Sequence, residues 1–554
     1  MNLKNLVYFI AIILIISSCA KQSTPMGGPR DEDPPQLIES NPKGQSTEVK
    51  PASIELIFDE YIKLDNPTKG IVITPRIDKD KVTFTALKNK VIVELDQELE
   101  DSTTYVFNFQ KSVIDISEEN PAENLKLVFS TGKTIDSLSI SGNINYLFQE
   151  KKIDYNNTII GVYPLSDTTN LFNEQPYYLT RADSAGKFQV GNIKNGKYRL
   201  YAWNDINGSL KAENKSEEYD FLNDTLTIDH NIEGIQFNLA KSDLTPIRIL
   251  RSGPFGQNYE IILNRDPAEL KIQNDGLGQE YFYTIEDKRI RLFSKSIQTD
   301  SIPFQLSLLD SVGSQKDSLI FAKFNTSERK PEKVTQSVNS GKSFYKDLEI
   351  EIKFNKPIVD INTDSLYVQY DSAGIIPIEK SFISISDSSK RDLIKINLSL
   401  PDSISKEIIT LKAADSTFQD IEGQYNLEPI AANYRKLKRE GLADAISGKI
   451  EGAEPPFIVQ LLDQKNQLIK ESYIEKNQNY SFSLLQPGTF IIRIIEDTNG
   501  NKRWDPSNIN SNRNAERVFY FTNEEGKKDI IIRGGWTLED QNIQGIEKTG
   551  ITNK

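Results

Sequence analysis

Two short acidic segments contain the side chains best suited to bind a ligand. Their oxygen-bearing residues stand at positions 1, 3, 5 and 9 of each segment: Asp205, Asn207, Ser209 and Glu213 in the first, and Asp497, Asn499, Asn501 and Asp505 in the second. Alternate residues of a tight turn can direct their oxygens to one hard cation, and this is the spacing of known calcium loops. The pattern predicts a structural Ca²⁺ ion in each segment, held by residues that are all ligand types.

A turn without metal explains the same residues. Calcium loops of this kind have glycine at position 6 and a bidentate glutamate at position 12. Here Leu210 and Lys502 occupy position 6, and the glutamate is missing from both segments. An Asn-Gly pair in each segment supplies the positive φ of a hairpin turn, and Asp and Asn side chains can cap their own backbone donors. The sequence leaves both interpretations open.

Side chains for catalysis are otherwise scarce. His230 is the only histidine and Cys19 the only cysteine, so no zinc cluster can form. His230 lies in a polar junction after a strand-like stretch, which favours a solvated surface position over a general base. No glycine-rich phosphate loop is present, and no spacing points to a pair of catalytic carboxylates. We therefore expect a protein that is not an enzyme.

Charge and aromatic content narrow the partners. The formal net charge of −13 and the lack of a basic stripe argue against nucleic acid. Trp203 lies beside the first acidic segment, and Trp504 lies within the second. Packing in a core or over an edge strand is favoured for both, and stacking on a sugar ring is the alternative.

The N-terminal residues predict export. Lys4 precedes an almost uninterrupted apolar run from Leu6 to Ile16, which is typical of a secretory signal and too short to span a membrane. Ile16-Ser17-Ser18-Cys19 resembles the lipobox of bacterial lipoproteins. This resemblance implies cleavage after residue 18, acylation of Cys19 and anchoring to the outer membrane by its acyl chains. The alternative is an ordinary signal that leaves an unpaired thiol.

A polar tether, residues 19–34, follows the predicted cleavage site. It is rich in glycine and proline and cannot bury a core. Acidic residues right after the lipidated cysteine direct some Bacteroidota lipoproteins to the cell surface, but here the acids begin only at Asp31. Whether the protein faces the cell surface or the periplasm therefore stays open.

The rest of the chain shows the period of β-strands. Ile54, Leu56 and Phe58 alternate with Ser53, Glu55 and Ile57, and Tyr105–Phe109 follows the same rule. Short alternating runs separated by Asn, Asp, Gly and Pro predict an all-β fold of tandem sandwiches in an extended array. The best helical candidate, residues 431–445, is equally consistent with a charged strand end and linker.

Internal repeats define the modules. Residues 54–62 align with 350–358, and residues 188–200 align without a gap with 480–492. The first copy of the second repeat carries extra residues, which we expect around 166–176. The repeats predict five modules, numbered 1 to 5 here: 35–136, 137–243, 244–328, 329–441 and 442–554.

Two module types resemble known families. Modules 1 and 4 resemble bacterial Ig-like domains, through Pro34-Pro35, the Ile54–Phe58 strand and an acidic turn that is Asp420–Gln424 in module 4. That turn lacks its glycine in module 1, at Asp115–Glu118. Modules 2 and 5 are similar to transthyretin-like and carboxypeptidase-regulatory-like sandwiches, and module 3 looks like a degenerate Ig-like domain. The whole chain resembles an Ig-like-domain lipoprotein family of Bacteroidota.

Three functions compete on this basis. The anchor, the interaction modules and the scarcity of catalytic groups favour a scaffold or accessory subunit of an outer-membrane complex with a β-barrel partner. A glycan-binding or adhesive surface protein is the alternative, although no aromatic platform is evident. An enzyme with two catalytic carboxylates is the least supported.

Overall fold

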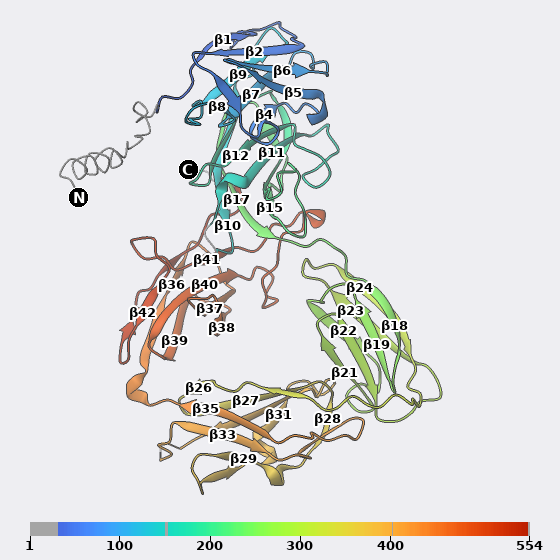
Figure 1. The fold of residues 1–554 in the computed structure, drawn as a ribbon. Coiled ribbons are helices and arrows are strands. Elements are labelled where there is room, and N and C mark those ends of the chain that lie inside the picture. The colour runs from blue at the N-terminus through green and yellow to red at the C-terminus, as the bar shows by residue number, and fades with distance from the viewer. Residues whose placement is uncertain (1–31, 150–152, 402, 552–554) are drawn as a thin grey trace, which may run out of the picture.

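The chain forms a series of β-sandwiches, which confirms the predicted fold class. The computed structural model describes residues 32–149, 153–401 and 403–551 (Figure 1). The predicted signal peptide, residues 1–18, and the predicted lipidation site, Cys19, lie outside the described residues. Within the described part of the chain, no helix is both long and apolar enough to cross a membrane.

Module 1 is a sandwich of two main sheets. The predicted alternation is confirmed, because Ile54, Leu56 and Phe58 are 0% exposed and face the core. Its elements are β1 (Leu37–Asn41), β2 (Ser53–Phe58), β6 (Lys90–Leu95) and β5 (Val82–Leu87) in one sheet, β4 (Val72–Thr74), β7 (Thr104–Gln110) and β9 (Leu125–Ser130) in the other, the pair β3 (Ile62–Leu64) and β8 (Val113–Asp115), and the short helices α2 (Pro67–Gly70) and η1 (Lys79–Lys81).

The acidic turn of module 1 closes without the glycine but is one residue longer than that of module 4, because the backbone N–H of Asp115 donates to Asn120 whereas that of Asp420 donates to Gln424. Asp115 accepts hydrogen bonds from the backbone N–H groups of Glu118, Glu119 and Asn120. Glu119 has a positive φ of 65°, four residues after Asp115, and Gly423 has one of 78°, three residues after Asp420. These carboxylate bonds offset the strain of a non-glycine residue in the left-handed region.

Module 2 is built around a sheet in the order β12-β11-β14-β15-β17-β10-β13. Strands β10 and β17 run parallel and lie side by side in this order. The elements are β10 (Leu138–Tyr146), η2 (Tyr155–Asn157), β11 (Thr158–Pro164), β12 (Tyr178–Arg181), β13 (Lys187–Ile193), β14 (Gly196–Asn204), β15 (Glu218–Phe221), β16 (Leu226–Ile228) and β17 (Ile232–Lys241).

Module 3 has two antiparallel sheets around its own apolar core. One sheet contains β18 (Ile249–Phe255), β19 (Asn258–Leu263), β22 (Arg289–Ser294) and β21 (Tyr281–Glu286), and the other contains β20 (Glu269–Gln273), β23 (Ile302–Leu309) and β24 (Gln315–Ala322). This is the two-layer architecture expected of a degenerate Ig-like sandwich.

Module 4 repeats the architecture of module 1. The stretch considered as a helix is extended, because β35 ends at Lys436 and β36 begins at Ala443 after one 3₁₀ turn, η5 (Arg439–Gly441). The other elements are β25 (Gln336–Val338), β26 (Ser343–Phe344), β27 (Asp347–Phe354), β28 (Ile358–Ile361), η3 (Thr363–Ser365), β29 (Leu366–Gln369), β30 (Ile375–Pro377), η4 (Lys380–Phe382), β31 (Ile383–Ile385), β32 (Leu393–Ser399), β33 (Ile408–Ala413), β34 (Phe418–Asp420) and β35 (Ile430–Lys436).

Module 5 repeats module 2, including its central hairpin. β39 and β40 correspond to β13 and β14, as the gap-free alignment predicts. The elements are β36 (Ala443–Glu451), β37 (Phe457–Asp463), β38 (Leu468–Ile474), β39 (Asn479–Leu485), β40 (Gly488–Glu496), η6 (Ile509–Ser511), β41 (Val518–Tyr520), β42 (Ile530–Ile532), β43 (Thr537–Leu538), β44 (Ile543–Gln544) and β45 (Gly550–Ile551).

The extra residues of module 2 are divided between two connections. The connection 165–177 is longer than its counterpart 464–467, as expected. The connection 147–157 is also longer than its counterpart 452–456, which the sequence alignment did not locate. Both insertions lie between strands, so the paired strands keep their register, and Ile153, Tyr155 and Tyr177 of these connections pack against the core of module 2.

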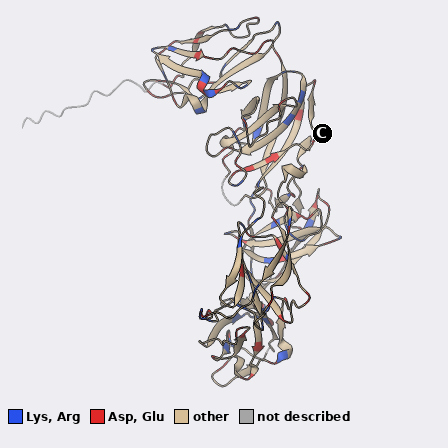
Figure 2. Cartoon of the chain, turned by 90° about the vertical axis from the view of Figure 1, so that its right-hand side faces the viewer, with Lys and Arg blue, Asp and Glu red and all other residues tan. Residues whose placement is uncertain are grey.

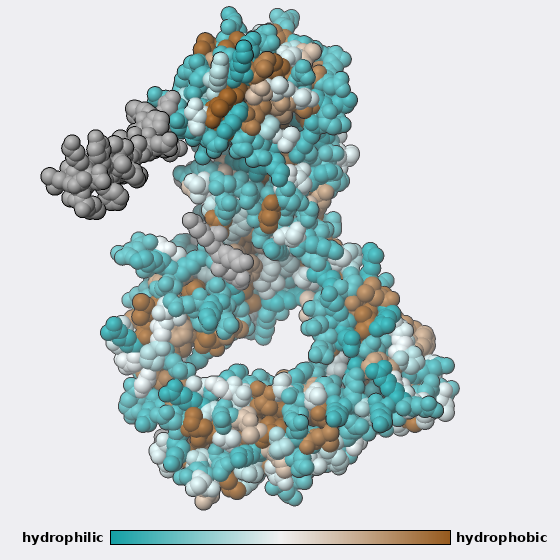
Figure 3. Space-filling view, in the orientation of Figure 1, coloured by the Kyte–Doolittle hydropathy of each residue, from teal (hydrophilic) through white to brown (hydrophobic). Residues whose placement is uncertain are grey.

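The modules do not form the extended array that we expected. The last strand, β45 of module 5, pairs with β17 of module 2, and an apolar cluster that includes Leu147 and Ile458 joins these two modules. Modules 2 to 5 therefore close into a ring around an opening, with module 1 attached outside it (Figures 1 and 3). Viewed from the side, the molecule is narrow, and charges of both signs are spread over its modules (Figure 2). Sequence periodicity could not predict this closure, because it depends on contacts between modules.

Candidate functional site: the module junctions

The first acidic loop closes on itself. Asp205 is buried, and its two carboxylate oxygens accept hydrogen bonds from the backbone N–H groups of Ser209 (2.9 Å) and Leu210 (3.3 Å). Asn207 donates through Nδ2 to Glu213 at 2.7 Å, and Gly208 has the positive φ, 73°, of the Asn-Gly turn. These are the contacts of an Asx-rich turn.

The second acidic loop has the same pattern. Asp497 is buried, and its carboxylate accepts from the backbone N–H groups of Asn501 (3.1 Å) and Lys502 (2.8 Å) and from the Tyr473 hydroxyl (2.9 Å). Asn501 donates through Nδ2 to Asp505 at 2.8 Å. Both predicted sets of residues are therefore brought together by the fold, and both are held by hydrogen bonds within the loop.

A buried glutamate that we did not predict braces each loop. Glu217 accepts from the backbone N–H groups of Ile206 and Glu213, both at 2.9 Å. Glu516 accepts from the corresponding N–H groups of Thr498 (2.7 Å) and Asp505 (2.9 Å). Burial raises the pKa of both glutamates above the ordinary value, although these hydrogen bonds oppose the shift.

The spacing of this brace differs between the loops. Glu217 follows Glu213 by four positions, whereas Glu516 follows Asp505 by eleven, so the second connection is seven residues longer. We call residues 506–512 the excursion. It hid the equivalence of the two glutamates, because an alignment without gaps places them at different positions.

The excursion brings module 5 to modules 2 and 3. Asn508 donates through Nδ2 to the carbonyl of Val312 in module 3 at 3.1 Å, and Arg513, just after the excursion, donates to the same carbonyl at 3.0 Å. Asn512 donates to the carbonyl of Asn223 in module 2 at 3.2 Å. The second acidic loop is thus the base of a three-module junction.

Asp220 of module 2 is the buried centre of the ring closure. It is 0% exposed, and its carboxylate accepts from Asn514 Nδ2 (2.9 Å) and Thr549 Oγ1 (2.5 Å) of module 5, and from the backbone N–H of Asn238 (2.6 Å). Burial raises the pKa of Asp220 to about 6, against the effect of these hydrogen bonds. The carboxylate binds two separate segments of module 5 and so couples their positions.

The first acidic loop lies at a different junction, between modules 1 and 2. Leu210 of the loop belongs to an apolar cluster with Val72 of module 1 and with Leu179 and Trp203 of module 2. The backbone N–H of Arg76 in module 1 donates to the carbonyl of Tyr177 in module 2 at 2.9 Å. Each acidic loop therefore supports a contact between modules.

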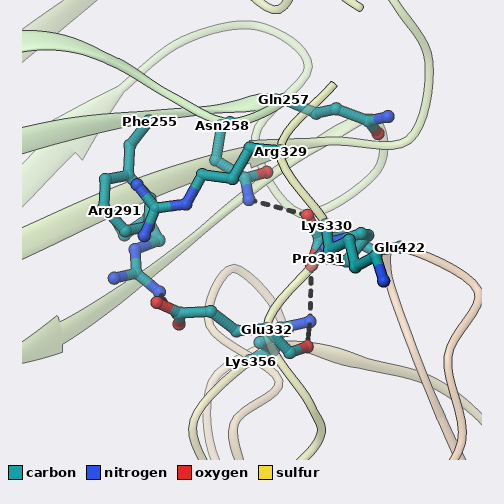
Figure 4. Close-up of a pocket in the computed structure, with 11 residues that line it drawn as sticks. Phe255, Gln257, Asn258, Arg291, Arg329, Lys330, Pro331, Glu332, Lys356 and Glu422 are labelled. Carbon is teal, nitrogen blue, oxygen red and sulfur yellow. Dashed lines mark hydrogen bonds and ion pairs between the residues drawn. The ribbon is translucent and has the colours of Figure 1, made fainter. Parts of the chain in front are cut away.

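The junction of modules 3 and 4 is built from buried charge (Figure 4). Lys356 is 1% exposed, and its ammonium lies 2.9 Å from Asp420 and 2.5 Å from Glu422. It also donates to the carbonyl of Glu332. Asn258 of module 3 donates through Nδ2 to Glu422 at 2.9 Å, which connects the ion cluster to the neighbouring module. A buried ammonium needs such partners, because an unpaired charge in the interior is strongly destabilising.

Two guanidinium groups stack on one ring at the same junction. Arg291 and Arg329 lie over Phe255, with 4.4 and 3.8 Å from each guanidinium carbon to the ring centroid. Arg291 also pairs with Glu332 at 2.7 Å. The cavity among these residues is about 10 Å³, barely one water molecule, so the charges hold the junction and leave no room for a substrate.

The acidic loops fit calcium by residue type only in part. The carboxylate oxygens of Asp497 are already used by N–H and hydroxyl donors, and the amide group that Asn501 turns toward Asp505 is its NH₂. Among the described residues, no group of three or more His, Cys, Asp or Glu side chains is arranged to hold a metal ion. Calcium binding stays a prediction, and the loops close without it.

The remaining sequence candidates lie on the surface or in packed positions. His230 is on the surface beside Asp229, as expected. Trp203 is buried in the cluster at the junction of modules 1 and 2, so it cannot stack on a sugar. Trp504 is half-buried, donates through Nε1 to the carbonyl of Glu516 at 2.9 Å and contacts Phe148 edge to face.

Family comparisons agree with the modular architecture. Residues 31–131 match the model of the bacterial Ig-like domain, which covers module 1. Residues 155–210 match the model described as polysaccharide lyase family 4, domain II, which covers part of module 2. The Ig-like modular architecture is thus supported, while the transthyretin-like and Bacteroidota lipoprotein resemblances stay predictions. No curated protein matches the chain.

The solved structures that the comparison found are distant from this chain. The Bacillus anthracis TIE protein is 9% identical, with 98% of this chain and 78% of that chain covered and a TM-score of 0.13. The S-layer protein rSbsC(31-844) is 10% identical, with 90% and 68% covered and a TM-score of 0.15. The human desmocollin-1 ectodomain is 8% identical, with 80% and 92% covered and a TM-score of 0.15. The functional argument therefore depends on this chain's own residues.

Proposed function

We propose that this protein is a non-catalytic lipoprotein that serves as a rigid scaffold or accessory subunit of an outer-membrane protein complex. The observation that carries the proposal is the closed ring of modules 2 to 5, whose junctions are fixed by buried polar side chains. Asp220 fixes the closure, and Lys356 fixes the junction of modules 3 and 4. A preformed assembly binds a partner without the entropic cost of ordering separate domains.

The way in which the carboxylates are used supports a role without catalysis. The buried acids Asp205, Asp497, Glu217 and Glu516 accept hydrogen bonds from the backbone of their own loops. The raised pKa values of Glu217 and Glu516 have a structural cause in this burial. Glu516 also lines a cavity of about 240 Å³, but the carboxylates of both glutamates are engaged by backbone N–H groups, which supports their role as braces.

The anchor supports a location at the membrane. In the proposal, Cys19 carries the acyl chains and residues 19–34 connect them to module 1. A Cys19→Ser variant should move from the outer-membrane fraction to the soluble periplasmic fraction. If the variant remains in the membrane fraction to the same extent, the proposed anchor is wrong.

The partner in this proposal is an integral outer-membrane β-barrel protein. The test is affinity purification of the full chain from native membranes in mild detergent, followed by mass spectrometry. We expect one barrel protein in stoichiometric amount. The Asp220→Leu variant, which removes the acceptor for Asn514 and Thr549, should retain the anchor and lose most of the barrel protein. Recovery of the chain alone from wild-type membranes would refute the subunit role.

One observation favours the alternative of glycan binding. A cavity of about 470 Å³ lies between modules 2 and 5, and the rings of Phe148 and Trp504 line it together with Asn204 and Glu218. The Oδ1 atom of Asn204 is buried without a hydrogen-bond partner. Rings beside polar groups suit a neutral sugar. Retention on immobilised neutral polysaccharide that is lost in Phe148→Ala would support this alternative, and a barrel partner in the purification would favour the scaffold role.

A further inference from the structure

A cavity at the junction of modules 1 and 2 combines apolar walls with basic side chains. Its volume is about 60 Å³. Module 1 contributes Ile73 and Phe84 to the walls, and module 2 contributes Leu179. Ile73 and Phe84 also pack against the core of module 1, so the apolar wall of the cavity is continuous with that core.

Two lysines of module 1 stand in the lining of this cavity. Lys69 lies on α2 and Lys79 on η1. Lys69 lies against Gly208 of the first acidic loop. Within residues 32–149, 153–401 and 403–551, neither ammonium has an ion pair or hydrogen bond to a carboxylate. Their charges are therefore not neutralised locally by the described part of the chain.

Other cations surround the same point. Arg181 and Lys211 of module 2 are close enough to act on Lys79. Burial is the main cause that lowers the pKa of Lys79; Asp205 opposes it, and Arg181, Lys69 and Lys211 lower it further.

Asp205 is the acid that faces this cluster, and it is already engaged. Its oxygens accept from two backbone N–H groups, and it pairs with Arg181 at 3.9 Å. Lys79 thus has Lys69, Arg181 and Lys211 as cationic neighbours, while Arg76, which also lines the cavity, pairs with Asp167 at 3.4 Å. Lys69 and Lys79 are exposed, so solvent screens their repulsion, but their ammonium groups are free to attract an anion to the mouth of the cavity.

We propose that this cavity binds an anionic amphiphile, a carboxylate or phosphate head with a short alkyl tail. The head lies between Lys69 and Lys79, and the first part of the tail enters between Ile73, Phe84 and Leu179; the cavity of about 60 Å³ cannot hold the whole tail, so the rest lies at its mouth. An inorganic anion alone leaves the apolar walls unfilled, and an uncharged alkyl chain leaves the lysines unpaired. Both parts of the ligand are therefore needed for tight binding.

Two sources can supply this chemistry: a free fatty acid and the headgroup of an anionic membrane lipid. The inference does not depend on the scaffold role, because the cavity is formed by modules 1 and 2 outside the ring closure. Its failure would leave the purification result for the barrel partner untouched.

The test uses the full chain with Cys19→Ser, purified without detergent so that no acyl chain or detergent competes. Isothermal titration calorimetry is run with octanoate, octyl phosphate, inorganic phosphate and octanol. We expect one binding site for octanoate and octyl phosphate, and binding at least about tenfold weaker for phosphate and octanol. Raising the salt concentration should weaken binding of the anionic probes, since the lysines are near the surface.

Variants assign the site. Lys69→Gln combined with Lys79→Gln should weaken octanoate binding about tenfold or more, because the head loses both cations. The matched control is Lys288→Gln combined with Lys316→Gln in module 3, which should bind as the parent chain does. Thermal melts of both variants check that the fold is retained. Unchanged octanoate affinity in the Lys69/Lys79 variant, or no binding of either anionic probe to the parent chain, would overturn the proposal.

Vesicles distinguish the two sources. Sedimentation with phosphatidylglycerol vesicles that is lost in the Lys69/Lys79 variant identifies a membrane headgroup as the ligand. Octanoate binding without sedimentation identifies a free fatty acid. If the chain sediments equally with phosphatidylcholine and phosphatidylglycerol vesicles, and the Lys69/Lys79 variant sediments as the parent does, the cavity is not a site for membrane lipids.

Discussion

The two acidic loops are copies of one hydrogen-bonded turn, and they lie at different junctions between modules. In both, a buried aspartate at the first position accepts two backbone N–H bonds, and a buried glutamate braces the loop from the other side. In module 2 the brace follows the loop directly. In module 5 the excursion, residues 506–512, is inserted before the brace and reaches modules 2 and 3. The second loop is therefore the one that participates in ring closure.

This difference shows how a repeat acquires a new contact without losing its turn. The brace tolerates an insertion because Glu516 lies just before β41, and the fold holds it against the loop. Its contact with the loop backbone therefore does not depend on how many residues separate it from the loop in sequence. Closing a loop over seven further residues has a small entropic cost, which the hydrogen bonds of the excursion to modules 2 and 3 can offset. The carboxylates thus act as fixed acceptors that make the excursion possible.

The largest effect is expected when alanine replaces the first aspartate of each loop, and it should distinguish the roles of the two loops. Asp205→Ala and Asp497→Ala should each lower the local stability by about 3 kcal/mol, because two partly buried N–H groups lose a charged acceptor. Hydrogen exchange should locate both losses within the loops. Only Asp497→Ala should also enlarge the radius of gyration in X-ray scattering, because its loop supports ring closure. Expansion in Asp205→Ala instead would show that the two loops have equal roles.

The second effect concerns pH and the closure itself. The pKa of Asp220 is raised to about 6 in the closed ring, so the closed state binds a proton more tightly than an open state in which the pKa is ordinary. Closure is then strongest below about pH 4, weakens as the pH rises through 6 and levels off above that, with a total loss of at most about 3 kcal/mol.

Scattering and hydrogen exchange of β45 between pH 4 and 7.5 measure this dependence. The Asp220→Asn variant should lose it, because its side chain does not titrate. A pH dependence of the same size in Asp220→Asn would assign the effect to another group. Glu217 of the first acidic loop also has a raised pKa, so hydrogen exchange in that loop should have a pH dependence of its own, which Asp220→Asn leaves in place.

How far the sequence predicts these features depends on how local they are. The alternation of Ile54, Leu56 and Phe58 gives the strands, since each side chain reports its own burial. The gap-free repeat places the two loops in register, and the Asn-Gly turns follow from residue type. Glu217 and Glu516 are hidden by their unequal spacing. The closure through β45, a strand of two residues, has no periodic pattern to reveal it.

Contacts between distant positions and between modules cannot be predicted from the sequence for the same reason. Lys356 and its partner Asp420 are 64 positions apart, and nothing in the pattern around either residue marks them as a buried pair. The cavity with Lys69 and Lys79 exists only where two modules meet. Periodicity and residue type thus predict the modules and turns, whereas the contacts between modules become visible only in the three-dimensional structure.

A smaller effect is expected from shortening the second loop to the length of the first. Deleting residues 506–512 restores the spacing of four between Asp505 and Glu516 and should preserve the brace. The junction with module 3 should lose about 2 kcal/mol, because the carbonyl of Val312 loses the bond from Asn508 and the bond from Arg513 is disturbed. Hydrogen exchange around Val312 should rise while the melting temperature of module 5 stays unchanged. A large fall in that melting temperature would show that the excursion is part of the loop's own stability.

The smallest effect separates a hydrogen-bonded turn from a calcium site. Because Asp497 is saturated by N–H and hydroxyl donors, we expect calcium and chelator to give melting temperatures within about 1 °C of each other for the full chain, which is less than 1 kcal/mol for a module of this size. The Asp505→Asn variant is the control that assigns any calcium effect to the second loop, since only this loop has an aspartate at position 9. A larger stabilisation by calcium that disappears in Asp505→Asn would identify a cation site in the second loop. The oxygens of Asn499 and Asn501 would then have to turn toward the ion, which amounts to a flip of two amide groups and the loss of their bonds to Asp505.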